Sequence, residues 1–225
     1  MGDFLASLTH PNGKIALFND ATQEIAPGTA SLLAYLHDLT GHRAEKRSAF
    51  PHSGYFVHED AEVFLAIDGG ELGPNYLPGH AHADIFSFEL SLGANPFVVD
   101  SGVFEYQAGE MRSYVRGTRA HNTLCVDRRD QAECWGGFRV ARRFAPFAVS
   151  FRANNGKVLF EGSFDGYAHL LGDGIIHHRR IEIDPERREL RVHDSVEGTG
   201  RHLVESLLHL HPAVQVTQEG SRTVL

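Results

Sequence analysis

From Phe50 onward, apolar and polar residues alternate in short runs that turn residues separate. The clearest run is Ile85–Leu92 (I-F-S-F-E-L-S-L), and alternation of period two is typical of a strand with one buried face. Asn-Gly and Asp-Pro sequences favour tight turns. Two pairs of runs flank such turns: Val149–Ala153 with Val158–Phe164, and Ile175–Ile183 with Glu189–Ser195. The pattern predicts an all-β domain folded as an antiparallel β-sandwich.

Further short runs fit the same architecture. We expect a hairpin from Tyr55–His58 and Glu62–Ile67, and single strands over Pro96–Asp100, His121–Asp127 and Phe138–Phe144. The sequence ends on Thr-Val-Leu225, inside an apolar pattern. We therefore expect the sandwich to be clipped at its C-terminus.

The first 48 residues follow a different pattern. Leucines recur at helical spacing in Gly28–Leu39, with Ser31 as a candidate N-cap and Gly41 as a stop signal. One or two helices cannot bury a core of their own. We expect residues 1–48 to be the end of a helical domain whose body lies outside this sequence, and residues 49–225 to form the sandwich.

The charge distribution narrows the class of ligand. The net charge of −8 argues against a general nucleic-acid-binding protein. Eight arginines nevertheless fall between positions 112 and 143, where only three acidic residues oppose them. Such a basic stretch in an acidic protein suits a local anionic ligand, although arginines on a solvated face would give the same composition.

The sequence carries no recognisable membrane or export signal. No apolar run approaches the roughly 20 residues that a membrane helix needs, and the N-terminus does not read as a signal peptide. Cys125 and Cys134 give neither a disulfide framework nor a C-x-x-C metal motif, so we expect two free thiols, with Cys125 buried in a strand.

The sharpest local motif is Gly79-His80-Ala81-His82-Ala83-Asp84. Two His residues at positions i and i+2 of an extended segment point to the same side, and imidazole and carboxylate groups are typical zinc ligands. A solvent-facing strand edge would explain H-x-H equally well. H-x-H-x-D also resembles the motif of metallo-β-lactamase-type hydrolases, but there a second His follows the Asp, and here Ile85 and an alternating strand follow.

Two more polar residues lie where site residues are commonly presented. Asp100 ends the apolar run Val98-Val99, and His121 opens another strand beside Asn122. Taken singly, Asp100 is also a common turn former and His121 an ordinary strand-start residue.

Together, these motifs resemble the heparinase II/III-like family from Leu77 to Arg143. The matching pieces are P-G-H-A-H-A-D-I-F-S-F-E-L-S-L-G, V-V-D-S-G-V-F-E-Y, M-R-S-Y-V-R-G-T-R-A-H-N-T-L and D-Q-A-E-C-W-G-G-F-R-V-A-R-R. Members of that family are lyases of acidic polysaccharides such as heparan sulfate, heparin and alginate. They combine an N-terminal α/α toroid with a C-terminal antiparallel sandwich of the supersandwich type. The resemblance makes residues 1–48 a remnant of the toroid plus a linker.

The resemblance also implies roles for individual residues. His82, Asp100 and His121 would bind a structural metal, usually zinc, and His80 would face the cleft and take part in catalysis. A Tyr that acts as base and acid commonly lies on the toroid, which this sequence lacks. The resemblance further implies a periplasmic or secreted parent protein in bacteria.

Other residues near the motifs are weaker candidates. Tyr106 and Tyr114 lie between Asp100 and His121 and are candidate catalytic groups, although each would also serve to pack the loop. The other candidates are substrate-binding residues: Arg112, Arg116 and Arg119 as clamps for carboxylates or sulfates, and Trp135 as a sugar platform or a core residue. We expect no metal at His177–His178 or at His209 and His211, the latter pair facing solvent or a sheet contact.

Two classes of function remain open. The motifs favour part of a lyase that cleaves uronate-containing glycans by β-elimination, incomplete without its toroid. The alternative is a non-catalytic carbohydrate-binding or scaffolding domain.

Overall fold

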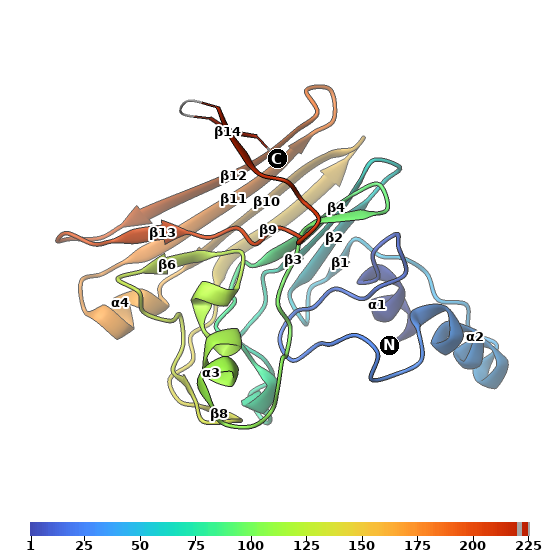
Figure 1. Ribbon diagram of the computed structural model, residues 1–225, viewed down its shortest axis with the longest axis horizontal. Coiled ribbons are helices and arrows are strands. Elements are labelled where there is room, and N and C mark those ends of the chain that lie inside the picture. The colour runs from blue at the N-terminus through green and yellow to red at the C-terminus, as the bar shows by residue number, and fades with distance from the viewer. Residues whose placement is uncertain (220–221, 225) are drawn as a thin grey trace.

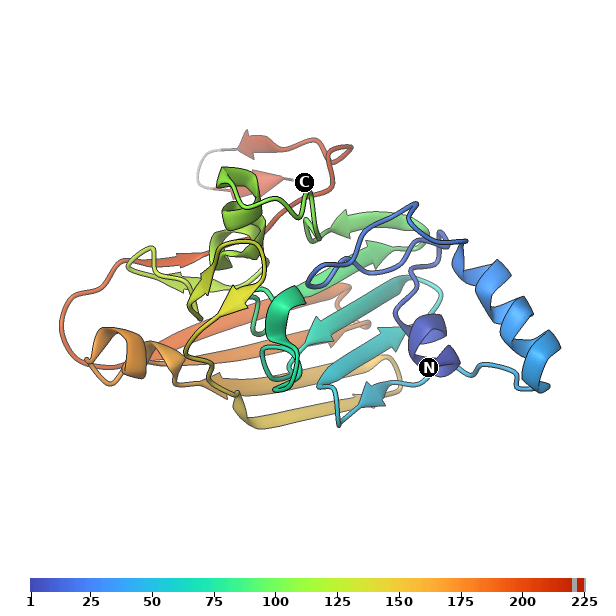
Figure 2. The same ribbon diagram turned by 90° about the horizontal axis from the view of Figure 1, so that it is seen from below.

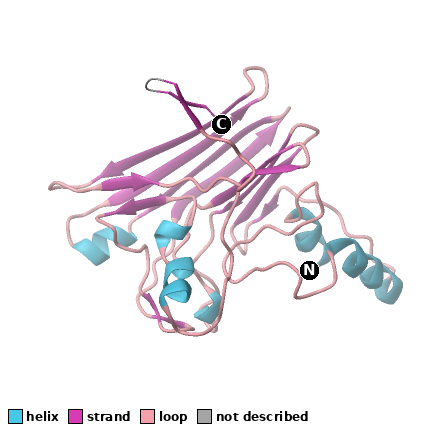
Figure 3. Cartoon of the chain, viewed as in Figure 1, coloured by secondary structure: helices cyan, strands magenta, loops and turns pink. Residues whose placement is uncertain are grey.

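The computed structural model describes residues 1–219 and 222–224, and its centre is a pair of antiparallel sheets (Figures 1 and 3). This confirms the predicted sandwich. One sheet has five strands in the order β1-β2-β3-β4-β5, namely Ala49–Phe50, Tyr55–Glu59, Val63–Asp68, Phe88–Leu92 and Asn95–Val98. The other has four in the order β12-β11-β10-β9, namely Glu189–Glu197, Ile176–Asp184, Lys157–Phe164 and Phe147–Asn154.

The main core lies between these sheets. Phe56 of the five-stranded sheet stacks on Phe151 with ring centroids 5.3 Å apart, and it also contacts Phe160. Phe160 is fully buried and meets Phe86 edge-on. Large apolar side chains from alternate positions of both sheets thus meet across the gap, which is the packing that the period-two pattern predicts.

A second, smaller core lies against β2 and β3 and includes the N-terminal segment. Leu8, Ala16 and Phe18 pack with Val57 and Phe64 there. β3 is therefore covered on both faces, because Phe64 contributes to one core and the adjacent Leu65 to the other. This two-sided burial explains why V-F-L-A-I is a continuous apolar run rather than an alternating one.

The three predicted hairpins are confirmed by their strand registers. The β9–β10 turn places Asn155 and Gly156 at positive φ (49° and 75°), as a tight hairpin turn with an Asn-Gly pair requires. The predicted free thiols are confirmed as well, and Cys125 is buried in β6 (Leu124–Val126).

Several predicted strands are shorter than expected. The run from Ile85 enters β4 only at Phe88, because Phe86 has a positive φ of 65° and the Ser87 N–H donates to the Asp84 carbonyl in a turn. In place of one strand over Phe138–Phe144, β8 (Arg139–Val140) pairs briefly with β7 (Cys134–Trp135). These segments are loops that carry polar groups, and alternation alone did not distinguish them from strands.

The N-terminal 48 residues contain two helices, α1 (Gly2–Ser7) and α2 (Thr29–Thr40). The predicted helix is confirmed, and Gly41 ends it in the left-handed conformation, φ 71°. Gly28, rather than Ser31, is its N-cap. The domain boundary at residue 48 stays a prediction, as does the toroid origin of this segment.

The remaining elements lie around the sheets. They are the 3-10 turns η1 (Pro78–His80) and η2 (Thr118–Ala120), α3 (Glu110–Arg116), α4 (Gly166–Leu171), β13 (Val204–Ser206), β14 (Thr217–Glu219) and β15 (Arg222–Val224). Figures 1 and 2 show α3 and the β7–β8 hairpin together on one side of the sheets. Within residues 1–219 and 222–224, no helix is long and apolar enough to cross a membrane, and Leu225 lies outside the described residues.

Candidate functional site

A cleft of about 710 Å³ runs along the start of β2 and the loop after β3, and His80 lines it. The His80 side chain is 58% exposed, so a ligand in the cleft can reach it. Gly54 and Gly70 form part of the wall, where a side chain at Gly54 would lie 2.0 Å from the Gly70 backbone. The close approach of these two backbone segments therefore requires glycine.

His80 and His82 do not lie on one strand, contrary to the sequence expectation. His80 ends the turn η1, and the chain becomes extended only at Ala81. The His82 side chain is fully buried, whereas that of His80 is exposed. The two rings nevertheless converge on a single group, the carboxylate of Asp20.

Asp20 is a site residue that sequence reasoning missed. Its carboxylate accepts hydrogen bonds from His80 Nδ1 and His82 Nε2, each at 2.8 Å, and pairs with both terminal nitrogens of Arg112. The side chain is only 4% exposed. Burial alone would raise the pKa of Asp20, but the hydrogen bonds from His82, Arg112 and His80 outweigh it and hold the pKa well below its ordinary value.

The three predicted metal ligands lie near one another. His121 Nδ1 is 2.8 Å from Asp100 Oδ2, and the ring centroids of His82 and His121 are 5.2 Å apart. His82 Nδ1 and His121 Nε2 are buried and have no hydrogen-bond partner. Both oxygens of Asp100 are engaged, Oδ2 by His121 and the Ser87 hydroxyl, and Oδ1 by the Gly102 N–H.

Burial and charge shift the pKa values of these groups in opposite directions. Burial lowers the pKa of His82 to about 4, more than the hydrogen bond to Asp20 raises it. Burial also acts to lower the pKa of His121, but the Asp100 carboxylate outweighs it and raises that pKa to about 9. Asp84 is buried, and its Oδ2 has no hydrogen-bond partner. Its pKa lies well above the ordinary value, mainly because of burial and secondly because of the nearby Asp68 carboxylate.

In the described part of the chain, no three His, Cys, Asp or Glu side chains are positioned to bind a metal ion without moving. The unpartnered nitrogens of His82 and His121 are nevertheless the kind of buried donor atom that a metal would satisfy.

The three candidate arginines lie in different environments. Arg112 is fully buried, and besides Asp20 it contacts the Gly137 carbonyl at 2.9 Å. Arg116 is buried against the carbonyls of Ala81 and Gly137. Arg119 is half-exposed and pairs with Glu205. A substrate contact by Arg112 would require the guanidinium to leave these partners, and the unpartnered Nη2 of Arg116 is itself buried. The role of both residues in binding stays a prediction.

The candidate aromatic residues are all exposed. Tyr106 lies beside His80, with ring centroids 6.1 Å apart, and stacks on Phe138. Trp135 is 51% exposed with the Arg139 guanidinium over its ring, so it is not a core residue. Tyr114 lines a different, shallow hollow with Arg119. The fold therefore places Tyr106, but not Tyr114, next to His80.

The remaining His pairs lie in or beside strands. His177 is buried and bonded to Asp194. The predicted sheet contact of His209 and His211 is present, because their backbone groups bond to Val99 and Phe97. His209 is half-buried, and its Nε2 is buried without a partner.

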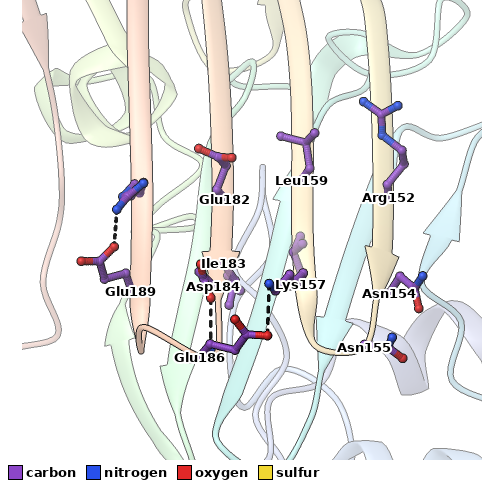
Figure 4. A pocket seen from close by; sticks show the side chains of 12 residues that line it. Arg152, Asn154, Asn155, Lys157, Leu159, Glu182, Ile183, Asp184, Glu186 and Glu189 are labelled. Carbon is purple, nitrogen blue, oxygen red and sulfur yellow. Dashed lines mark hydrogen bonds and ion pairs between the residues drawn. The ribbon is translucent and has the colours of Figure 1, made fainter.

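A second hollow, of about 560 Å³, lies at the β9–β10 and β11–β12 hairpin ends (Figure 4). Its charged groups pair with one another: Lys157 with Glu186 at 3.3 Å and Arg191 with Glu189 at 2.5 Å. It holds no converging His or unpaired buried group among those drawn in Figure 4, so the cleft beside His80 is the better candidate.

Comparison with known proteins places the chain in a family context. The model of the heparinase II/III-like C-terminal domain matches residues 42–225. No curated protein sequence matches the chain. Among solved structures it is similar to the heparinase III product of the BT4657 gene, with TM-score 0.73 and 18% identity over 96% of this chain and 34% of that one. It is also similar to the heparan sulfate lyase HepC from Pedobacter heparinus, with TM-score 0.70 and 16% identity over 94% of this chain and 34% of that one. The chain thus spans about a third of the length of these structures.

Proposed function

Because the chain belongs to the heparinase II/III-like C-terminal domain family, we propose that it forms the sandwich part of a polysaccharide lyase. The substrate class would be uronate-containing acidic glycans, cleaved by β-elimination. The observation that carries the proposal is the exposed imidazole of His80 in the cleft, whose Nδ1 is hydrogen-bonded to the buried carboxylate of Asp20.

The reaction explains why an imidazole is wanted there. β-Elimination removes the proton next to the uronate carboxyl group and expels the 4-linked oxygen. One group must take the proton, another must protonate the leaving oxygen, and the carboxyl charge must be tolerated in the transition state. His80 would serve as one of the proton-transfer groups, and Tyr106, whose ring lies next to it, is the sandwich residue best placed to assist.

We further propose that His82, Asp100 and His121 hold a zinc ion. Two buried imidazole nitrogens without partners and a nearby carboxylate are a donor set that suits zinc. When bound, zinc would supply a fixed positive charge that ties the His82 loop to the segments carrying Asp100 and His121. The described side chains would have to shift for Asp100 to become a ligand, since both of its oxygens are engaged.

Zinc titration of the purified chain tests this site. We expect about one equivalent bound per chain, and a large loss of affinity in Asp100→Ala. The exposed Asp60→Ala serves as the matched control. A folded wild type that binds no zinc would contradict the proposed metal site. The lyase proposal would then depend on the cleft that His80 lines.

The rest of the active site would come from the toroid of the parent protein. The similar solved structures are about three times as long as this chain, and the catalytic Tyr would lie in the missing part.

The periplasmic or secreted location of the parent stays a prediction. The sandwich fold and the family match favour this reading over a metallo-β-lactamase-type hydrolase.

The alternative function is a domain that binds acidic glycans without cleaving them. An assay for the ultraviolet absorbance of unsaturated uronates, on heparan sulfate, heparin and alginate, separates the two. We expect signal from the full-length parent, little from this chain alone, and a loss of about 100-fold or more in the rate of the parent carrying His80→Ala. His42→Ala, an exposed His that also pairs with an aspartate, should leave the rate unchanged. Glycan binding by the parent without cleavage would favour the alternative.

A further inference from the structure

The N-terminal segment reaches into the site from outside the stretch that the family model matches. Phe18 anchors it in the second core. Asn19 adopts a positive φ of 56°, which Asn tolerates well, and its side-chain oxygen accepts the His82 N–H at 3.0 Å. On the other side of Asp20, the Ala21 carbonyl accepts the Val103 N–H at 3.0 Å, next to the Asp100 turn. Asp20 is therefore held in place by bonds from both of its neighbours.

The carboxylate of Asp20 determines which nitrogen of each ring carries a proton. Both oxygens of Asp20 accept from the Arg112 guanidinium, which can only donate. The nitrogens that face these oxygens are therefore donors, Nδ1 in His80 and Nε2 in His82. In the neutral ring of His80, the lone pair is then on Nε2, the nitrogen left available to the cleft. In His82 it is on Nδ1, which is buried without a partner.

Arg112 fixes the orientation of this carboxylate. Its two terminal nitrogens pair with the two oxygens of Asp20, and its Nε donates to the Gly137 carbonyl. A buried, bidentate arginine balances the charge of Asp20 and prevents its rotation. The full burial of Arg112 fits this supporting role better than direct contact with a glycan.

We propose that Asp20 is a positioning residue of the site, which uses one carboxylate to fix opposite tautomers of His80 and His82. It would present a basic Nε2 of His80 to the substrate and a basic Nδ1 of His82 to the metal. Carboxylates that orient a catalytic or ligating imidazole through its other nitrogen act in this way elsewhere. The role in catalysis rests on the proposed lyase function, whereas the tautomers do not depend on it.

The tautomers can be measured directly on the whole chain. Long-range ¹H–¹⁵N correlation spectra of the imidazoles, recorded at about pH 8 where ordinary His is neutral, distinguish the two forms, and His80→Gln identifies the His80 signals. We expect the Nδ1–H form for His80 in the wild-type protein. A wild-type His80 in the Nε2–H form would overturn the proposal, whether or not any variant folds.

The variant Asp20→Asn provides a second test of the proposal. Its amide places one oxygen and one NH₂ group where the two rings now contact two different oxygens, so only one ring keeps its acceptor, and the NH₂ group would oppose Arg112. We expect the ring that faces the NH₂ group to lose its tautomer: either His80 shifts toward the Nε2–H form, or zinc affinity, which depends on His82, falls by about 10- to 100-fold, with the folded amide spectrum retained. The matched control is Asp3→Asn, since Asp3 also pairs with a His and an Arg in the N-terminal segment but does not line the cleft; it should change neither readout.

A folded Asp20→Asn variant in which the His80 tautomer and the zinc affinity are both unchanged would also overturn the proposal. The lyase function is tested separately: a parent without cleavage activity whose His80 is the Nδ1–H form would contradict the proposed function while supporting the positioning role.

Discussion

At the scale of single residues, Asp194 is a clear case of a buried carboxylate held by ion pairs away from the cleft. Its carboxylate receives two hydrogen bonds of 2.7 Å from the buried Arg179 and others from His177 and Ser206. Burial alone would raise the pKa of Asp194, but the bonds from Arg179 and His177 hold it far below the ordinary value of 3.8.

Asp194→Asn should therefore destabilise the fold by about 3–5 kcal/mol near neutral pH, because it leaves the buried Arg179 charge uncompensated. Folding lowers the pKa of Asp194, so its contribution is complete above the ordinary pKa and declines as the pH falls toward the folded-state value. Urea unfolding at about pH 7 and about pH 3 should show the difference between wild type and variant shrinking at the lower pH.

The control for this prediction is Glu189→Gln on the same strand, which removes an exposed ion pair with Arg191 and should change stability little. An Asp194→Asn variant as stable as the wild type, or a difference that grows as the pH falls, would contradict the account.

The sequence motifs predicted four residues of the candidate site but not Asp20. The motifs identified His80, His82, Asp100 and His121, because H-x-H-x-D and the flanking strands are local patterns. Asp20 lies 60 residues before His80, in a segment with no recognisable motif. The packing of Phe18 against the sheet and the hydrogen bonds of Asn19 and Ala21 bring it there, and no property of a single sequence reports such contacts.

At the scale of elements, prediction succeeded where one local rule determined the structure. The Asn155-Gly156 turn and the alternating runs beside it gave the β9–β10 hairpin, and Gly41 gave the end of α2. It failed where polar loops alternate like strands. Phe86 at positive φ and the short β7–β8 pairing interrupt runs that read as continuous, because backbone geometry there follows tertiary hydrogen bonds rather than periodicity.

At the scale of the whole molecule, the cleft combines two parts of the chain: the sandwich supplies His80, and the N-terminal segment supplies its buried support, Asp20. The similar solved structures extend over about three times the length of this chain. We propose that the parent protein, with this sandwich in place, breaks glycosidic bonds by elimination.

Mass spectrometry of the products from a defined heparan sulfate or alginate oligosaccharide tests that claim most directly. Elimination splits the substrate into two fragments whose masses add up to the substrate mass, one of them carrying an unsaturated uronate, and this is the result we predict. Fragments whose summed mass includes an added water would indicate a hydrolase. An uncut substrate that still binds would indicate a glycan-binding module, and either result would contradict the account.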